Sequence, residues 1–107
     1  MKRKDTQVYR KTIEKYCDLR NNVERYFTER ERLTNAINDL KELISKQTDI
    51  KVIQKLKNDL NVTEYCVEAI KYTFYDGKFE EMKRIETILI NDYNDNVDII
   101  YSTYKIF

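Results

Sequence analysis

Side chains capable of catalysis are scarce in this chain of 107 residues. It contains no histidine, the commonest general base of enzymes. Its only serines, Ser45 and Ser102, do not stand in the GxSxG setting of a serine hydrolase. A single glycine, Gly77, cannot build a phosphate-binding loop, which needs two or more. We therefore expect no enzyme, no catalytic residue and no cofactor-binding residue.

One segment partly matches a calcium-binding loop. Asp92, Asn94 and Asn96 occupy the first three ligand positions of an EF-hand. The sixth position requires glycine for its sharp turn but holds Val97, and the twelfth requires glutamate but holds Thr103. The chain also lacks the CxxC pairs and histidines of zinc sites. We expect a turn here, and no metal site in the chain.

The two cysteines, Cys17 and Cys66, are expected to be free and buried. In an antiparallel hairpin that turns near residues 47–48, Cys17 lies opposite roughly residue 78. Cys66 is then ~12 residues away along the helix axis, or ~18 Å. A disulfide requires Cα atoms within ~7 Å, so the hairpin excludes an internal bridge.

Basic residues gather near the N-terminal end of the chain, at Lys2, Arg3, Lys4, Arg10, Lys11 and Lys15. Lys and Arg neutralise phosphates, so contact with nucleic acid through this cluster is an alternative function. Three acidic residues, Asp5, Glu14 and Asp18, dilute the cluster. No pair of short helices joined by a tight turn suggests a helix-turn-helix. An ordinary solvated helix surface is the simpler interpretation.

Two apolar repeats of seven residues define the elements that must position these groups. Such spacing places one apolar edge along a helix, as in a coiled-coil seam. The first repeat consists of Tyr9, Tyr16, Val23, Arg30, Ile37 and Ile44, with Leu19, Tyr26, Leu33 and Leu40 between them. The second consists of Ile53, Leu56, Leu60, Thr63, Val67, Ile70 and Phe74. The chain is therefore predicted to be all-α, as one helical domain over residues 1–107.

Four helices are predicted, over about 6–46, 50–75, 78–91 and 96–106. Asp5 or Thr6 can cap the first, and Thr48 or Asp49 the second. Gly77 ends the second helix, because glycine enters the left-handed conformation without strain. The third helix has Phe79, Met82, Ile85, Ile88 and Leu89 on its apolar face. The short C-terminal helix has Val97, Ile100, Tyr104 and Phe107 on one face.

Two topologies fit this pattern, both with antiparallel, coiled-coil-like packing. In a three-helix bundle, Gly77 turns the chain and the third helix packs back. In a long hairpin, Gly77 only kinks a helix running from about 50 to 90. The second helix carries a second apolar stripe of Val62, Tyr65, Cys66, Ala69 and Tyr72. A helix with two apolar faces is packed on both sides. The bundle supplies that second layer internally, whereas the hairpin needs a partner chain, so we favour the bundle.

Arg30 is the one charged residue in the first seam. A charge at such a position can fix register or partner choice. In the hairpin it lies opposite Tyr65 and Cys66, within reach of Glu64 or Glu68. The other interpretation is that Arg30 lies beside the seam and extends to solvent. The sequence does not separate the two.

Nine tyrosines are a further signal. Tyr9, Tyr16 and Tyr26 lie in the first seam and are expected in the core. A second group is less easily buried in a chain of this length: Tyr65, Tyr72, Tyr75, Tyr101 and Tyr104. Tyrosine is enriched at binding hot spots because it joins a large contact area to a polar tip. We expect this second group to bind a partner.

Charge and hydropathy set the expected location. The net charge is +1, from 20 basic and 19 acidic residues, so no global field attracts nucleic acid or membranes. No apolar run exceeds three residues, as in Ile88-Leu89-Ile90, against the ~18 that a membrane span needs. No apolar signal-peptide core follows the basic N-terminus. We expect a protein of the cytoplasm, in a bacterium or a virus-infected cell.

The expected function is that of a small non-catalytic helical protein–protein interaction module. Abundant Lys, Ile, Asn and Tyr without His, Pro or Trp is typical of A/T-rich genomes. That composition suggests an accessory factor of a phage, plasmid or virus, which binds a host replication or transcription protein. The partner is another protein or a second copy, and no small-molecule substrate is expected. A nucleic-acid-associated regulator using the basic N-terminus and a structural scaffold oligomer are the alternatives.

Overall fold

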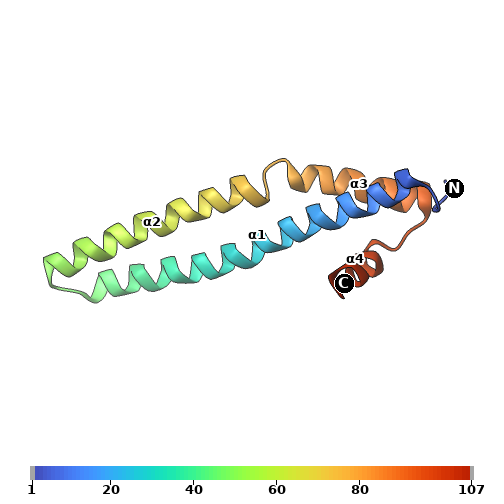
Figure 1. Ribbon diagram of the computed structural model, residues 1–107. Helices are drawn as coiled ribbons and strands as arrows, with labels where there is room; N and C mark the ends of the chain where they lie inside the picture. Colours follow the sequence, from blue (N-terminus) through green and yellow to red (C-terminus); the bar gives the residue numbers. More distant parts are fainter. Residues whose placement is uncertain (1, 107) are drawn as a thin grey trace. The chain divides into compact units, whose positions relative to one another are not determined.

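The computed structural model of the protein describes residues 2–106, and it is all-α over that range. Its helices are α1 (Gln7–Lys46), α2 (Ile50–Phe74), α3 (Lys78–Tyr93) and α4 (Val97–Ile106) (Figure 1). The predicted fold class is confirmed: long helices pack antiparallel, and a short C-terminal helix follows. The helix limits lie within two residues of those expected from the apolar periodicity. Phe107, expected on the apolar face of the last helix, lies outside the described residues.

Polar side chains cap the starts of three helices. Thr6 Oγ1 accepts a hydrogen bond of 3.1 Å from the backbone N–H of Tyr9 at the start of α1. Asp49 Oδ1 accepts one of 2.9 Å from the N–H of Lys51 at the start of α2. Asn96 Oδ1 accepts bonds of 3.1 and 3.2 Å from the first turn of α4. These oxygens satisfy donors that a helix leaves unpaired at its N-terminus, so they fix where each helix begins.

The chain divides into two compact units, and α1 contributes to both. The hairpin unit comprises residues 25–74, and the terminal unit combines residues up to Glu24 with residues from Tyr75 onward. That the whole chain forms one domain stays a prediction.

In the hairpin unit, residues 25–46 of α1 run antiparallel to α2 (Figure 1). Every residue of the second repeat is half-buried, and no residue of α2 is fully buried. On α1, Tyr26 and Leu33 are buried, and Ile37, Leu40 and Ile44 are half-buried. The seams thus face inward as predicted, but two helices alone can cover each other only in part.

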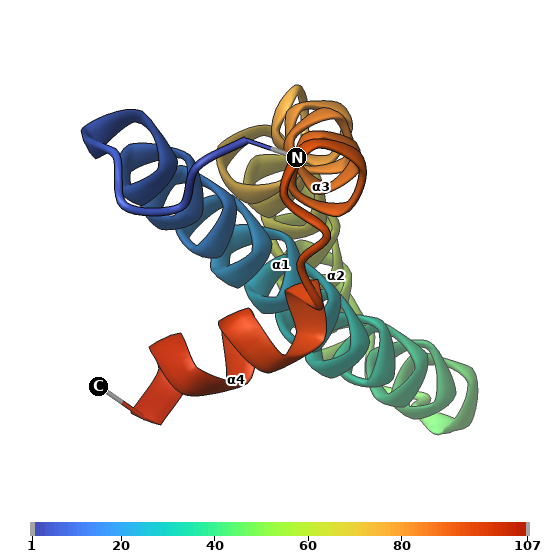
Figure 2. The same cartoon turned by 90° about the vertical axis from the view of Figure 1, so that its right-hand side faces the viewer.

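The terminal unit has a more completely buried core, built from three helices. Its buried residues are Tyr16, Cys17 and Val23 of α1, Met82, Ile85, Leu89 and Tyr93 of α3, and Val97 and Tyr101 of α4. α1 and α3 run antiparallel here: Tyr9 packs on Tyr93 with ring centroids 4.7 Å apart, and Tyr16 bonds to Glu86. Figure 2 shows α4 starting beside α1 and running obliquely to its N-terminal part.

Gly77 adopts the left-handed conformation, with φ 75°, between α2 and α3. In the terminal unit, α3 packs on the N-terminal part of α1, where Tyr9 and Ile13 lie against the core that contains Tyr16 and the buried residues of α3. Whether Gly77 turns the chain back along the second helix or only kinks it stays a prediction.

Candidate functional site

An apolar stripe on α2 faces solvent in the hairpin unit. Val62, Tyr65 and Tyr72 are 63%, 74% and 80% exposed, and Ala69 between them is also exposed. These four residues, which we call the α2 face, recur every three or four positions and lie opposite the half-buried seam of α2. The sequence predicted that this stripe would be covered within the chain. It is not, and the hairpin alternative required a partner chain to cover it.

Exposure of this kind is informative because of the residue types involved. A single exposed apolar side chain is ordinary, whereas a row of them with two tyrosines is typical of a protein-binding surface. Tyrosine immobilises few rotatable bonds for the area it covers, and its hydroxyl can still hydrogen-bond at the edge of an interface. The α2 face can therefore bind a partner through apolar contacts and hydrogen bonds.

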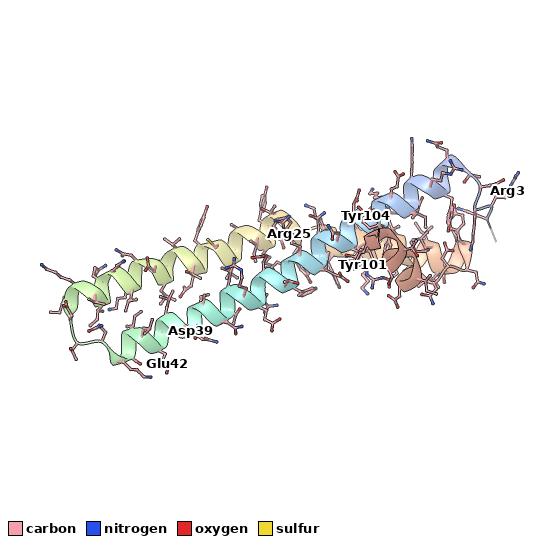
Figure 3. All side chains as sticks on the ribbon, turned by 60° about the horizontal axis from the view of Figure 1, so that its bottom comes forward. Arg3, Arg25, Asp39, Glu42, Tyr101 and Tyr104 are labelled. Atoms are coloured by element: carbon pink, nitrogen blue, oxygen red, sulfur yellow. The ribbon has the colours of Figure 1, made fainter. Side chains whose placement is uncertain are left out.

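The other three tyrosines of the predicted binding group lie in the terminal unit. Tyr75 is half-buried and stacks on Phe79, with centroids 5.3 Å apart. Tyr104 is 40% exposed, and its hydroxyl donates a bond of 2.7 Å to Asp18. Tyr101 is only 3% exposed, which removes it from any binding surface of the folded unit. Tyr101 belongs to the buried core that α1, α3 and α4 share; Figure 3 labels it on α4 together with Tyr104.

Arg20 is a residue whose role the sequence analysis missed. Its guanidinium donates to the hydroxyl of Tyr16 at 3.0 Å and to the backbone oxygen of Val97 at 3.4 Å. It also forms ion pairs with Asp98 at 2.9 Å and with Glu24 at 3.5 Å. One side chain of α1 therefore holds the first turn of α4 in place.

The sequence contained a signal for the contact between α1 and α4. Basic residues are in excess in one of the two segments of the terminal unit, and acidic residues are in excess in the other. Residues 2–24 carry seven Lys and Arg against four Asp and Glu, whereas residues 75–106 carry four against seven. Opposite charges of this kind favour packing of the two segments on each other. The whole-chain balance of +1 concealed the difference.

Besides Tyr104, three further tyrosine hydroxyls of the terminal unit donate to carboxylates. Tyr9 bonds to Asp95 at 2.9 Å, Tyr16 to Glu86 at 3.0 Å and Tyr101 to Glu24 at 3.0 Å. Burial, followed by these bonds to acceptors that favour the neutral phenol, raises the pKa of each of the three tyrosines to about 12. The phenols therefore serve as structural hydrogen-bond donors and not as bases near neutral pH.

The predicted nucleic-acid cluster is largely engaged in ion pairs. Lys2 pairs with Asp92 at 3.2 Å, Lys4 with Asp95 at 2.7 Å and Arg3 with Asp5 at 2.8 Å. Lys15 pairs in the same way with Glu81 at 3.1 Å, and Glu81, which Arg84 also contacts, has its carboxyl pKa lowered to about 2. Arg10 and Lys11 remain exposed, and neither forms an ion pair within residues 2–106.

Arg30 is exposed in the hairpin unit and forms no ion pair with Glu64 or Glu68 there. It borders a shallow hollow on α1 together with Phe27, Glu31, Thr34 and Asn35. Its side chain thus lies beside the buried seam residues Tyr26 and Leu33, as the second interpretation expected. A role in partner choice stays a prediction.

A groove of about 590 Å³ opens between α1 and α4 in the terminal unit. It is lined by Lys4, Tyr9, Arg10, Ile13, Glu14, Ile99, Ile100, Thr103 and Tyr104. Its surface is mostly apolar, and Arg10 and Glu14 stand on the α1 wall. Figure 2 shows α4 diverging from the N-terminal part of α1 on this side.

Other classes of site receive no support from the described residues. Both cysteines are free, Cys17 buried and Cys66 half-buried. No group of three or more potential metal ligands lies together anywhere in residues 2–106. Within the same range, no helix is long and apolar enough to span a bilayer. No protein-family model matches this chain, and neither a curated protein nor a solved structure shows significant similarity to it.

Proposed function

We propose that the protein is a small non-catalytic helical module that binds another protein through the α2 face. The observation that carries this proposal is the exposure of Val62, Tyr65 and Tyr72 in one row on a helix whose opposite side forms the hairpin seam. A helix that packs on both sides needs a second layer, and within the hairpin unit that layer is missing.

The form of the stripe suggests what the partner presents. From Val62 to Tyr72 the α2 face extends for ~15 Å along the helix. A stripe with three- and four-residue spacing fits a partner helix packed alongside it, with side chains interleaved. The small Ala69 lets a bulky partner residue approach the helix between the two tyrosines.

The biological setting rests on composition. An accessory factor of a phage, plasmid or virus, acting in the cytoplasm on a host replication or transcription protein, fits a small chain from an A/T-rich genome. The nucleic-acid alternative through Lys2, Arg3, Lys4, Arg10 and Lys11 is less well supported, because three of these cations already lie in ion pairs. A scaffold oligomer would instead use the α2 face for self-assembly.

An affinity experiment tests the proposal. The wild-type chain, the double variant Tyr65→Ser/Tyr72→Ser and the control Lys57→Ser/Lys71→Ser are used to capture proteins from the source cell. The control changes two exposed residues of the same helix outside the α2 face. We expect a partner that the wild type and the control retain and the tyrosine variant loses. The purified partner must then bind with the same ranking.

Two further results would contradict the proposal. Equal capture by all three chains would show that binding does not use the α2 face. Loss of the partner on nuclease treatment would move the function to the nucleic-acid class. Light scattering tests the alternative function of a scaffold oligomer. A scaffold should form assemblies larger than a dimer, and these should disappear in the tyrosine variant.

A further inference from the structure

The groove between α1 and α4 carries two exposed residues of opposite charge on its α1 wall. Arg10 and Glu14 are one helical turn apart, a spacing at which opposite charges often pair along a helix. Both are exposed on the α1 wall, and within residues 2–106 neither forms an ion pair with the other or with any third residue. Beside them, Ile99 is 64% exposed and Ile13 is half-buried.

We propose that this groove binds a second copy of the chain through the same groove, forming a two-fold symmetric dimer. This inference uses residues of the terminal unit alone and is independent of the α2 face. It can therefore fail without affecting the proposed function, and the reverse also holds.

Charge complementarity identifies the occupant. A two-fold axis that passes near residue 12 at right angles to α1 sets the α1 helices of two copies antiparallel. Arg10 of each copy then lies opposite Glu14 of the other, because the sum of the paired residue numbers is constant across an antiparallel pair. An isologous interface requires such a self-complementary arrangement, in which residue i meets j and j meets i. A second copy supplies it without any assumption about an unknown sequence.

The apolar lining gives the contact its affinity. Ile13, Ile99 and Tyr104 of each copy would be covered by the same residues of the other, which removes apolar surface from water. The two charge pairs at the rim add little affinity, but they set the antiparallel orientation and disfavour other arrangements. The groove is lined by nine residues, fewer than the roughly 20–30 that each partner contributes to a standard interface, so the dimer should be weak and concentration-dependent.

Sedimentation of the full chain over a range of concentrations tests this dimer. The wild type should pass from monomer to dimer, and Arg10→Glu and Glu14→Arg should each dimerise at least tenfold more weakly. In each variant, both rim contacts join like charges. An equimolar mixture of the two variants should form a heterodimer of about wild-type strength, because the two acidic rim side chains of one chain then face the two basic rim side chains of the other.

Lys11→Glu is the matched control. It makes the same change of charge at the neighbouring exposed residue, which lines a different surface between α1 and α3. It should leave the dimer unchanged, and circular dichroism should show equal helix content in all variants. The proposal is overturned if the wild type stays monomeric, if Lys11→Glu weakens the dimer as much as Arg10→Glu, or if the mixed variants do not associate.

Discussion

The guanidinium of Arg20 lies over the ring of Tyr101, with its central carbon 4.5 Å from the ring centroid. Such contacts between a cation and an aromatic face contribute about 0.5–2 kcal/mol. The same guanidinium binds the first turn of α4 through Asp98 and the carbonyl of Val97. Tyr101 in turn bonds from α4 to Glu24, on the same helix as Arg20. This pair of residues fixes α4 on α1.

Replacement of Arg20 should therefore destabilise the terminal unit. We expect Arg20→Met to lower the free energy of unfolding by about 2 kcal/mol, because Asp98, Glu24 and the Val97 carbonyl lose a charged donor while the methionine keeps part of the packing. Urea denaturation followed by circular dichroism measures the loss. Hydrogen exchange should quicken most in α4.

Arg32 provides the control for that experiment. It pairs with Glu29 on the exposed surface of α1 at 2.8 Å. Arg32→Met should change stability by less than about 0.5 kcal/mol, as is usual for an exposed pair within one helix. Equal losses in the two variants would contradict a specific role for Arg20.

The tyrosine–carboxylate bonds predict a loss of stability at high pH. The pKa values of Tyr9, Tyr16 and Tyr101 in the folded chain are about 12, above the value of about 10 in an unfolded chain. A raised pKa means that the stabilisation is complete below pH 10 and is lost as the pH rises from about 10 to about 12. Absorbance at 295 nm should show at least these three of the nine tyrosines ionising late, together with loss of helix. Uniform ionisation near pH 10 with unchanged helix content would contradict the geometry.

The stability cost of substituting Gly77 should depend on the backbone conformation at this position alone. A Cβ added there would meet no atom within 4 Å, so the cost comes from the positive φ of 75°. Gly77→Ala should destabilise the chain by about 1 kcal/mol, because a left-handed residue other than glycine is strained. Gly77→Asn should cost less, since asparagine tolerates this region, as Asn94 does at φ 56°. Thermal melts that rank alanine as the least harmful substitution would contradict this account.

Mutation of the hairpin seam should destabilise the chain much more than mutation of the α2 face. Tyr65→Ser removes an exposed ring and should change the free energy of unfolding by at most about 0.5 kcal/mol. Leu33→Ala removes a buried side chain and leaves a cavity in its place, so it should lower the free energy of unfolding by about 2–3 kcal/mol. Chemical denaturation of both variants checks the ranking. A large loss in Tyr65→Ser would mean that this ring already packs within the chain.

The helices were predictable because local physics determines them. Apolar periodicity places the seams, and the caps at Thr6, Asp49 and Asn96 are short-range interactions. The path of the chain after Gly77 was not predictable in this way, since a left-handed glycine ends a helix equally well in a turn or a kink. Which one forms depends on where α3 finds an apolar face, and that is a long-range property.

The candidate binding residues were predictable only in part. Tyr65 and Tyr72 lie opposite a long seam, so their exposure follows from periodicity once no second layer covers them. Tyr101 and Tyr104 lie three positions apart on a helix of ten residues, which is too short for periodicity to decide which side faces α1. Contacts with Asn21 and Glu24, about 80 residues earlier in the chain, decide it.

The division of the chain into units has a consequence for the order of folding. Residues 25–74 are contiguous and can close their hairpin through the short turn between α1 and α2. The terminal unit instead joins two segments separated by fifty residues, so its formation carries a larger loop-closure entropy and a higher contact order. During synthesis, Tyr16 and Val23 find their partners only after α3 has left the ribosome. The hairpin should therefore form first and shorten the effective loop that the terminal unit must close.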